Sequence, residues 1–196
     1  MSDVFTAFPE KTTRDPLTYK HYLAFPNDGI KKEIIEGDLC MSPAPSLKHQ
    51  TILKRLAHLL DDYVHQKQLC EIFIAPCDVI LSDINVVQPD IVFISRENYS
   101  ILNELNVQGA PDVVFEISSP SSRETDLIFK KRIYERFGVK EYWIVDPEAE
   151  AIEIFQNKEN QFQLLAKAVP QQPLVSQLIE GLELDLAAIF SGQATA

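Results

Sequence analysis

The chain has 196 residues and a formal net charge of −11, with 45% hydrophobic and 24% charged residues. This length supports one domain with a packed core better than two domains. The acidic charge and the lack of a basic run exclude a protein that binds DNA non-specifically through a broad basic surface. A local basic patch, or a dimer cleft with bound metal, can still hold DNA.

No apolar run approaches the roughly 20 residues that span a bilayer, so we expect no membrane partner. The segment Met1–Arg14 lacks the basic start and the apolar centre of a secretory signal. The three cysteines, Cys40, Cys70 and Cys77, form no CxxC pair and indicate neither a disulfide framework nor a zinc cluster. We therefore expect a cytoplasmic protein.

The chain is predicted to divide into three parts. Residues 1–16 are polar and contain Pro9 and Pro16, which indicates a flexible N-terminal arm. Residues 17–190 hold the regular hydrophobic patterns and are predicted to form a single α/β domain. Residues 191–196 then form a C-terminal tail.

The first half of the domain predicts helices and strands in alternation. In chain order these are a short helix from Thr18 to Phe25, a hairpin of Ile30–Ile35 with Leu39–Met41, a helix over Leu47–Gln66, and strands over Glu71–Leu81 and Val86–Ile94. The long helix is capped by Ser46, and apolar residues from Ile52 to Val64 recur at i, i+3, i+4 and i+7. That spacing predicts an amphipathic helix of about five turns.

The second half predicts a central strand followed by a helix and further strands. In chain order these are a polar stretch over Arg96–Gln108, a strand over Val113–Ile117, a helix over Arg123–Phe137, a strand over Glu141–Val145, a hairpin of Ala151–Phe155 with Phe162–Ala166, and a last short helix over Leu182–Phe190. The nearly continuous apolar run at 113–117 is typical of a strand buried on both faces. The middle of the domain is therefore predicted to have the element order αβββαβ. Its two helices cover a sheet that the outer hairpins extend.

Two carboxylates stand where a core strand would not place them. Asp90 follows Pro89 at the start of an apolar strand, and Glu116 lies inside the apolar run 113–117. A buried carboxylate is costly unless it is paired or bound to metal. If the two strands are neighbours, Asp90, Glu116 and the carbonyl of Ile117 can converge on one Mg²⁺ or Mn²⁺ ion. The alternatives are a turn residue for Asp90 and an arginine partner for Glu116.

Phosphodiester hydrolysis also needs a cation beside the metal. Nucleases of this plan normally carry a lysine two residues after the glutamate, but that position is Ser118. The second helix offers a replacement, because Asp126, Lys130 and Tyr134 are spaced i, i+4 and i+8 on one stripe. Lys130 can lean toward the end of the Glu116 strand. The alternative is a solvated helix lysine.

Three further residues are accessory candidates with open alternatives. Glu33 is either an accessory metal ligand or a surface charge of the hairpin. Asp126 is either functional or a first-turn acid that suits the helix dipole. His49, near a helix start, is either catalytic or a capping and packing group.

The order of these motifs resembles the Uma-two family of restriction-endonuclease-like proteins, within the PD-(D/E)xK nuclease superfamily. The stretches that carry the resemblance are Glu33–Gly37, Ser42–Pro45 with His49, Gln88–Asp90, Ala110–Ser121, then Asp126, Lys130, Tyr134 and Gly138–Trp143. The resemblance covers roughly residues 17–190. It implies a restriction-endonuclease-like mixed sheet of αβββαβ order, a divalent-metal site and a lysine moved to the helix.

We expect a Mg²⁺- or Mn²⁺-dependent nuclease that acts on DNA. Asp90 and Glu116 would hold the metal, and Lys130 would stabilise charge on the attacked phosphate or orient the attacking water. The alternative is a non-catalytic protein of nuclease fold that binds nucleic acid or a protein partner, which the acidic charge and Ser118 favour. A homodimer is also expected, because Phe155 and Phe162 lie on a hairpin at the sheet margin, where edges tend to be covered.

Overall fold

The computed structural model describes residues 15–68, 70–119, 125–172, 174 and 176–191. The helices are α1 (Tyr19–Tyr22), α2 (Leu47–Lys67), α3 (Lys131–Phe137) and α4 (Leu186–Phe190), with a 3₁₀ helix η1 (Arg96–Ile101) and a π-helix η2 (Thr125–Lys130). The strands are β1 (Lys31–Ile35), β2 (Asp38–Ser42), β3 (Cys70–Ile74), β4 (Val79–Ser82), β5 (Asn85–Val87), β6 (Ile91–Ser95), β7 (Val107–Gln108), β8 (Val113–Ile117), β9 (Glu141–Asp146), β10 (Ala151–Lys158) and β11 (Gln161–Ala168). Most of the predicted arm (1–16) and tail (191–196) lies outside the described residues.

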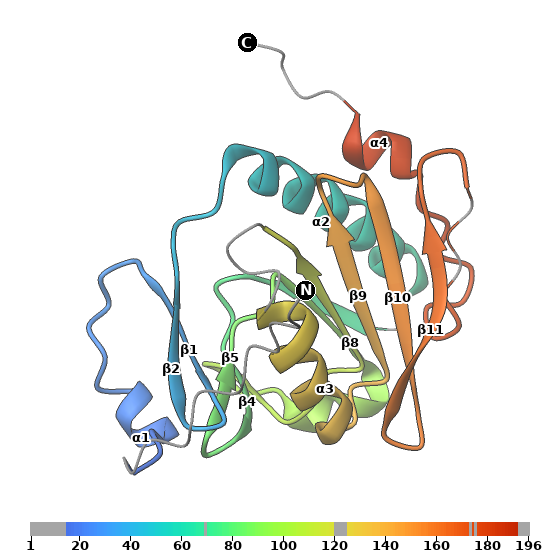
Figure 1. The fold of residues 1–196 in the computed structure, drawn as a ribbon. Helices are drawn as coiled ribbons and strands as arrows, with labels where there is room; N and C mark the ends of the chain where they lie inside the picture. The colour runs from blue at the N-terminus through green and yellow to red at the C-terminus, as the bar shows by residue number, and fades with distance from the viewer. Residues whose placement is uncertain (1–14, 69, 120–124, 173, 175, 192–196) are drawn as a thin grey trace, which may run out of the picture.

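The strands form two sheets (Figure 1). The larger has the order β11-β10-β9-β8-β6-β3 and the smaller the order β2-β1-β5-β4-β7. In the larger sheet β6 runs antiparallel to both β3 and β8, whereas β9 runs parallel to β8 because α3 forms the crossover. The elements α2, β3, β6, β8, α3 and β9 therefore make the predicted restriction-endonuclease-like αβββαβ core, and the α/β fold class is confirmed.

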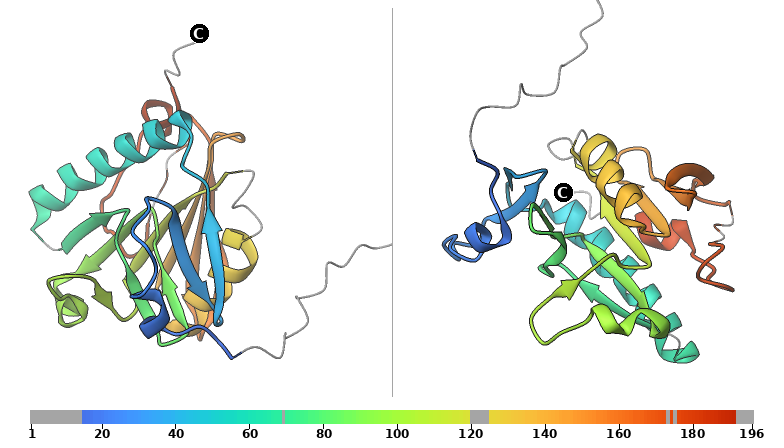
Figure 2. Two further views of the ribbon diagram at one scale, coloured as in Figure 1. Left: turned by 90° about the vertical axis from the view of Figure 1, so that its left-hand side faces the viewer. Right: turned by 90° about the horizontal axis from the view of Figure 1, so that it is seen from below.

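The two main helices cover opposite faces of the larger sheet, as Figure 2 shows. Successive residues of β8 point to opposite faces, so Phe115 packs in the cluster that contains α2 while Val114 packs in the cluster that contains α3. Both residues are fully buried. The apolar run at 113–117 is therefore a central strand covered on both sides, as its composition predicts.

Proline divides two of the predicted strands. The strand expected over Glu71–Leu81 is split into β3 and β4 around Pro76, and the strand expected from Val86 to Ile94 is split into β5 and β6 around Pro89. Proline has no N–H to donate to a sheet ladder, so each strand ends there and its continuation joins the other sheet.

The N-terminal hairpin does not extend the central sheet, which corrects that expectation. Strand β1 pairs with β5, with Ile34 opposite Val86, and both side chains are fully buried. The C-terminal hairpin does extend the central sheet, because β10 pairs along β9 from Ala151 to Gln156. The smaller sheet therefore stands beside the larger one and carries the β1–β2 hairpin (Figure 1).

The last helix is shorter than predicted, and the described part of the second helix is not α-helical throughout. The described part of the helix expected over Arg123–Phe137 begins as the π-helix η2 and continues as α3. It ends as predicted at Gly138, whose φ of 85° suits a residue without Cβ. Helix α4 begins only after Asp185, whose carboxylate accepts a hydrogen bond from the Ala187 N–H.

Within the described ranges, no helix combines the length and apolarity needed to cross a membrane.

Candidate active site

Asp90 and Glu116 meet at one end of two adjacent strands. In the β6–β8 ladder Ile91 lies opposite Phe115, so the next step of the antiparallel register places Asp90 opposite Glu116. The Ile117 N–H donates a 2.7 Å hydrogen bond to Asp90 Oδ2. The prediction that the two strands are neighbours is confirmed, and both carboxylates are buried.

Asp90 is also contacted from α2. The first turn of this helix carries His49, whose Nε2 lies 3.2 Å from Asp90 Oδ2. Burial by itself would raise the pKa of Asp90, but the hydrogen bond from His49 and the charge of Lys31 lower the pKa below its ordinary value. Asp90 is therefore ionised at neutral pH, although it is almost completely buried.

Glu116 receives two donors from the helix on the other side of the sheet. Lys130 Nζ and Tyr134 Oη each donate a 2.9 Å hydrogen bond to Glu116 Oε1. The lysine is 2% exposed and also lies 2.9 Å from Glu33 Oε1. Lys130 thus sits between two buried carboxylates, which rules out the solvated-lysine alternative.

The end of η2 and α3 turn both polar and apolar side chains to the sheet. Lys130, Ile133 and Tyr134 are buried, whereas Phe129 and Phe137 are only half-buried. Lys131 lies 3.5 Å from the centre of the Phe155 ring. The side chain of Asp126 lies outside the described residues.

Glu33 is part of this cluster and is not a surface charge of the hairpin. The residue is 2% exposed, and its Oε1 accepts a 2.7 Å hydrogen bond from the Gln88 N–H. Burial would raise the pKa of Glu33, but the positive charges of Lys130 and Lys31 lower it below its ordinary value. The charge on Glu33 is therefore retained at neutral pH.

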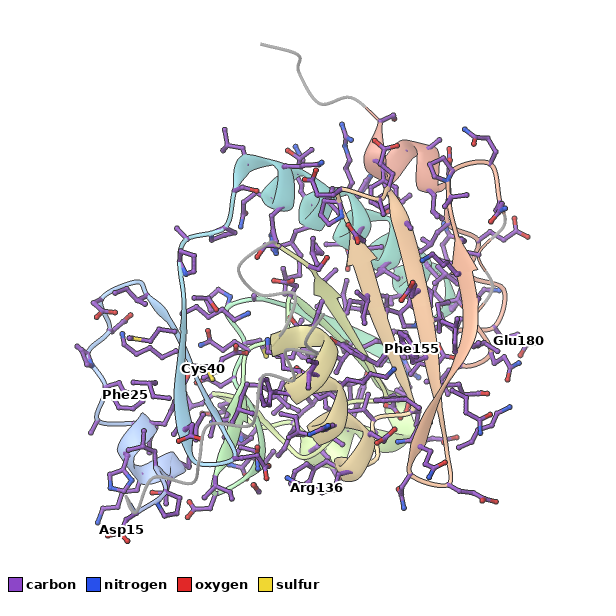
Figure 3. All side chains as sticks on the ribbon, in the orientation of Figure 1. Asp15, Phe25, Cys40, Arg136, Phe155 and Glu180 are labelled. Atoms are coloured by element: carbon purple, nitrogen blue, oxygen red, sulfur yellow. The ribbon has the colours of Figure 1, made fainter. Side chains whose placement is uncertain are left out.

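These side chains line one cleft of about 1070 Å³ between the β1–β2 hairpin, α2 and the turn after β3. The candidate residues on its wall are Glu33, His49, Asp90, Glu116, Ile117 and Lys130. Figure 3 labels Cys40 on β2, which also lines the cleft, and Phe155 on the other side of α3 in that view. The cleft thus collects residues from the two sheets, from α2 and from the last residue of η2.

Comparison with known proteins identifies the family. Residues 19–187 match the family model described as "Uma2: Putative restriction endonuclease". The chain belongs to the Uma2 family. The resemblance seen in the sequence is thereby confirmed, and membership supports a nuclease-like function.

A solved structure supports the fold of this Uma2 chain. A crystal structure from Anabaena variabilis, titled "putative nuclease belonging to DUF820", matches with a TM-score of 0.75 and 20% sequence identity. The match covers 90% of this chain and 98% of the other. At this identity the likeness shows the restriction-endonuclease-like fold alone. No curated protein matches the chain.

The donor chemistry of the Uma2 site fits Mg²⁺ or Mn²⁺. Among the described residues of the cleft, the carboxylates Glu33, Asp90 and Glu116 supply oxygen donors, and the ammonium groups of Lys31, Lys54 and Lys130 line the same cleft. In the described ranges no group of three His, Cys, Asp or Glu side chains is arranged around a metal position. Mg²⁺ is commonly held by one or two carboxylates with water completing its shell, so Asp90 and Glu116 with the Ile117 carbonyl are a sufficient donor set.

Two residues of the Uma2 site were missed or undervalued in the sequence. Tyr134 was given no role of its own, but it is fully buried and its hydroxyl donates a hydrogen bond to Glu116. Gln88 was noted only as the first residue of the Gln88–Asp90 motif. Its backbone N–H donates a hydrogen bond to Glu33, and its side-chain amide donates to Tyr22 and Asp78. The i, i+4 spacing of Lys130 and Tyr134 was the available signal for the tyrosine.

Proposed function

We propose that this protein is a Mg²⁺- or Mn²⁺-dependent endodeoxyribonuclease that hydrolyses phosphodiester bonds of DNA. The observation that carries the proposal is the placement of Asp90 and Glu116 at opposite positions of adjacent strands, both opening onto one cleft. Lys130, which lies 2.9 Å from Glu116, lines the same cleft. Family membership supports the nuclease class.

The residues divide into ligands and a charge donor. Asp90, Glu116 and the Ile117 carbonyl would hold the ion, which supplies Lewis-acid activation of the phosphate and of water when it is bound. The Lys130 ammonium stabilises the negative charge that gathers on the attacked phosphate, and it does so more strongly in a buried site than in water. Glu33 holds Lys130 in place through their 2.9 Å contact.

A second candidate is a nuclease-fold protein that binds a nucleic acid or a protein without cutting. Two observations favour this candidate. Lys130 already forms ion pairs with Glu33 and Glu116, and the net charge of the chain is −11. An acidic protein releases few counterions on binding DNA, so it gains little non-specific affinity.

Cleavage assays on plasmid, linear duplex and single-stranded DNA with Mg²⁺ or Mn²⁺ separate the two candidates. The endonuclease proposal expects cleavage by the wild type and none by Glu116→Gln, which loses a charged ligand. A double variant, Glu33→Gln with Lys130→Gln, keeps the net charge of the Glu33, Lys130 and Glu116 cluster, and we expect it to lose about 10²–10³ in rate. Lys131→Ala is the control. If the wild type cuts no form of DNA, the binding protein takes the place of the nuclease.

We also propose that the protein acts as a homodimer. Phe155 and Phe162 are half-buried and pack with the α3 cluster, so the apolar surface available for a partner is elsewhere on the hairpin. Strand β11 forms an edge of the larger sheet and exposes Leu164, which is 55% accessible. Such an edge favours association with a second strand.

A further inference from the structure

Each of the two carboxylates has one oxygen that accepts two hydrogen bonds from the protein. Asp90 Oδ2 accepts from the Ile117 N–H at 2.7 Å and is contacted by His49 Nε2 at 3.2 Å. Glu116 Oε1 accepts from Lys130 at 2.9 Å and from the Tyr134 hydroxyl at 2.9 Å. In each case one donor, His49 or Tyr134, has no role in the reaction proposed above.

His49 is a hydrogen-bond donor to Asp90. An ionised carboxylate only accepts hydrogen bonds, so the Nε2 atom that faces Asp90 must carry a proton. The other ring nitrogen, Nδ1, is buried and has no hydrogen-bond partner among the described residues. Among those residues, the ring therefore makes its hydrogen bond to Asp90 through Nε2.

Tyr134 is likewise restricted to the role of a donor. Its side chain is fully buried between α3 and the sheet. Burial, and then the charge of Glu116, raise the pKa of the Tyr134 phenol well above its ordinary value. The phenol therefore keeps its proton and donates it in the hydrogen bond to Glu116 Oε1.

We propose that His49 and Tyr134 are positioning residues, which hold Asp90 and Glu116 in the one orientation that suits a divalent cation in the cleft. This inference rests on the proposed metal site. Each carboxylate can rotate about its last bond, and a donor on one oxygen restricts that rotation. Partners of this kind, which contact a ligand and not the ion, typically change metal affinity or activity by about 10–100-fold when they are removed.

Mn²⁺ titration of the full chain by calorimetry tests the proposal without any need for cleavage. His49→Gln places an amide N–H near the position of Nε2, whereas His49→Asn is shorter and reaches only the position of Nδ1. We expect His49→Asn and Tyr134→Phe each to weaken Mn²⁺ binding by about 10–100-fold. His49→Gln is expected to stay close to the wild type. Urea denaturation of the same variants reports any loss of stability separately.

The outcomes separate the positioning role from other roles. If His49→Gln and His49→Asn lose affinity equally, or if affinity merely follows stability, the positioning role is overturned. Wild-type-like Mn²⁺ binding by His49→Asn and Tyr134→Phe also overturns it. If the expected series of affinities appears but no DNA is cut, the positioning role stands and the nuclease proposal fails. If the wild type binds no Mn²⁺, both fall with the metal site.

Discussion

Lys130 holds a positive charge in a place where 2% of the residue is exposed. The charge is tolerated because Glu33 and Glu116 each lie 2.9 Å away. Removing a partner from a buried ionic cluster leaves an uncompensated charge, which costs more than the cluster contributes to stability. The ligand-free protein therefore depends on Lys130 for stability as well as for the proposed chemistry.

We expect Lys130→Met to lower the free energy of unfolding by about 3–5 kcal/mol, because two buried carboxylates then face each other. Urea denaturation without divalent ions measures this. Lys131→Met loses the contact with the Phe155 ring and the attraction of Glu135 and Glu153, and it should cost about 1 kcal/mol or less. Equal losses in the two variants would contradict the buried cluster.

Asp112 should make stability depend on pH. Burial would raise the pKa of this carboxyl, but Lys140, whose Nζ lies 2.6 Å from Oδ1, and the Ser95 N–H lower it below its ordinary value. A lowered folded-state pKa means that the stabilisation is fully present above the unfolded value of about 3.9 and is lost as pH falls through the folded value.

The substitution Asp112→Asn is therefore expected to lower the free energy of unfolding at pH 7. In this variant the free energy of unfolding should also fall less steeply as the pH is lowered below about 4. Urea denaturation across a range of pH measures both effects. Asp61→Asn, at an exposed position of α2, is the matched control. An equally steep fall in Asp112→Asn and in the wild type would show that Asp112 is not a source of this dependence.

At the scale of elements, the site depends on where α2 begins. Ser46 is the N-cap, and its hydroxyl accepts a hydrogen bond from the His49 N–H. The cap thus fixes the same turn that brings the His49 ring to Asp90. Lys130 stands at the junction of η2 and α3, and the end of α3 at Gly138 leads directly into β9. The helix ends therefore set the spacing of the residues around the carboxylates.

We expect Ser46→Ala to cost about 1 kcal/mol of stability, the usual effect of losing an N-cap side chain. Chemical denaturation measures the change, with Ser100→Ala at an exposed position of η1 as the control. Because His49 lies in the capped turn, the loss should be accompanied by weaker Mn²⁺ binding. A stability loss no larger than that of Ser100→Ala would argue against the cap.

At the scale of the whole molecule, the cleft exists because the chain builds two sheets. Strand β1 carries Glu33 on the smaller sheet, while Asp90, directly before β6, and Glu116 in β8 belong to the larger one. Residues of the β1–β2 hairpin and of α2 line this cleft. The outer edge of the larger sheet, β11, lies at the far end of the strand order from β3, so a partner there would leave the cleft open.

The homodimer prediction is tested at this edge. We expect light scattering to give twice the monomer mass at micromolar concentration. Leu164→Lys, which places a charge on the exposed edge, should yield monomers. Leu105→Lys is the control, because Leu105 is also exposed but lies in the loop between η1 and β7. A monomeric wild type would refute the prediction.

The sequence by itself determined the order of the main elements and the two central carboxylates, Asp90 and Glu116. The apolar run around Glu116 and the Pro89-Asp90 step are local patterns, and strand burial and proline chemistry act over a few neighbouring residues. The i, i+4 spacing also brought Lys130 forward as the replacement for the lysine absent at Ser118. These features need no knowledge of distant segments, so they can be predicted from the chain alone.

Only the tertiary structure decided how the surrounding residues act. His49 meets Asp90 across 41 residues of chain, and that contact depends on how the first turn of α2 lies over the end of the sheet. Glu33 becomes a buried partner of Lys130 because β1 pairs with β5 and leaves the central sheet. Pairing of distant strands and burial of charge are set by the packing of the whole domain, which local periodicity does not encode.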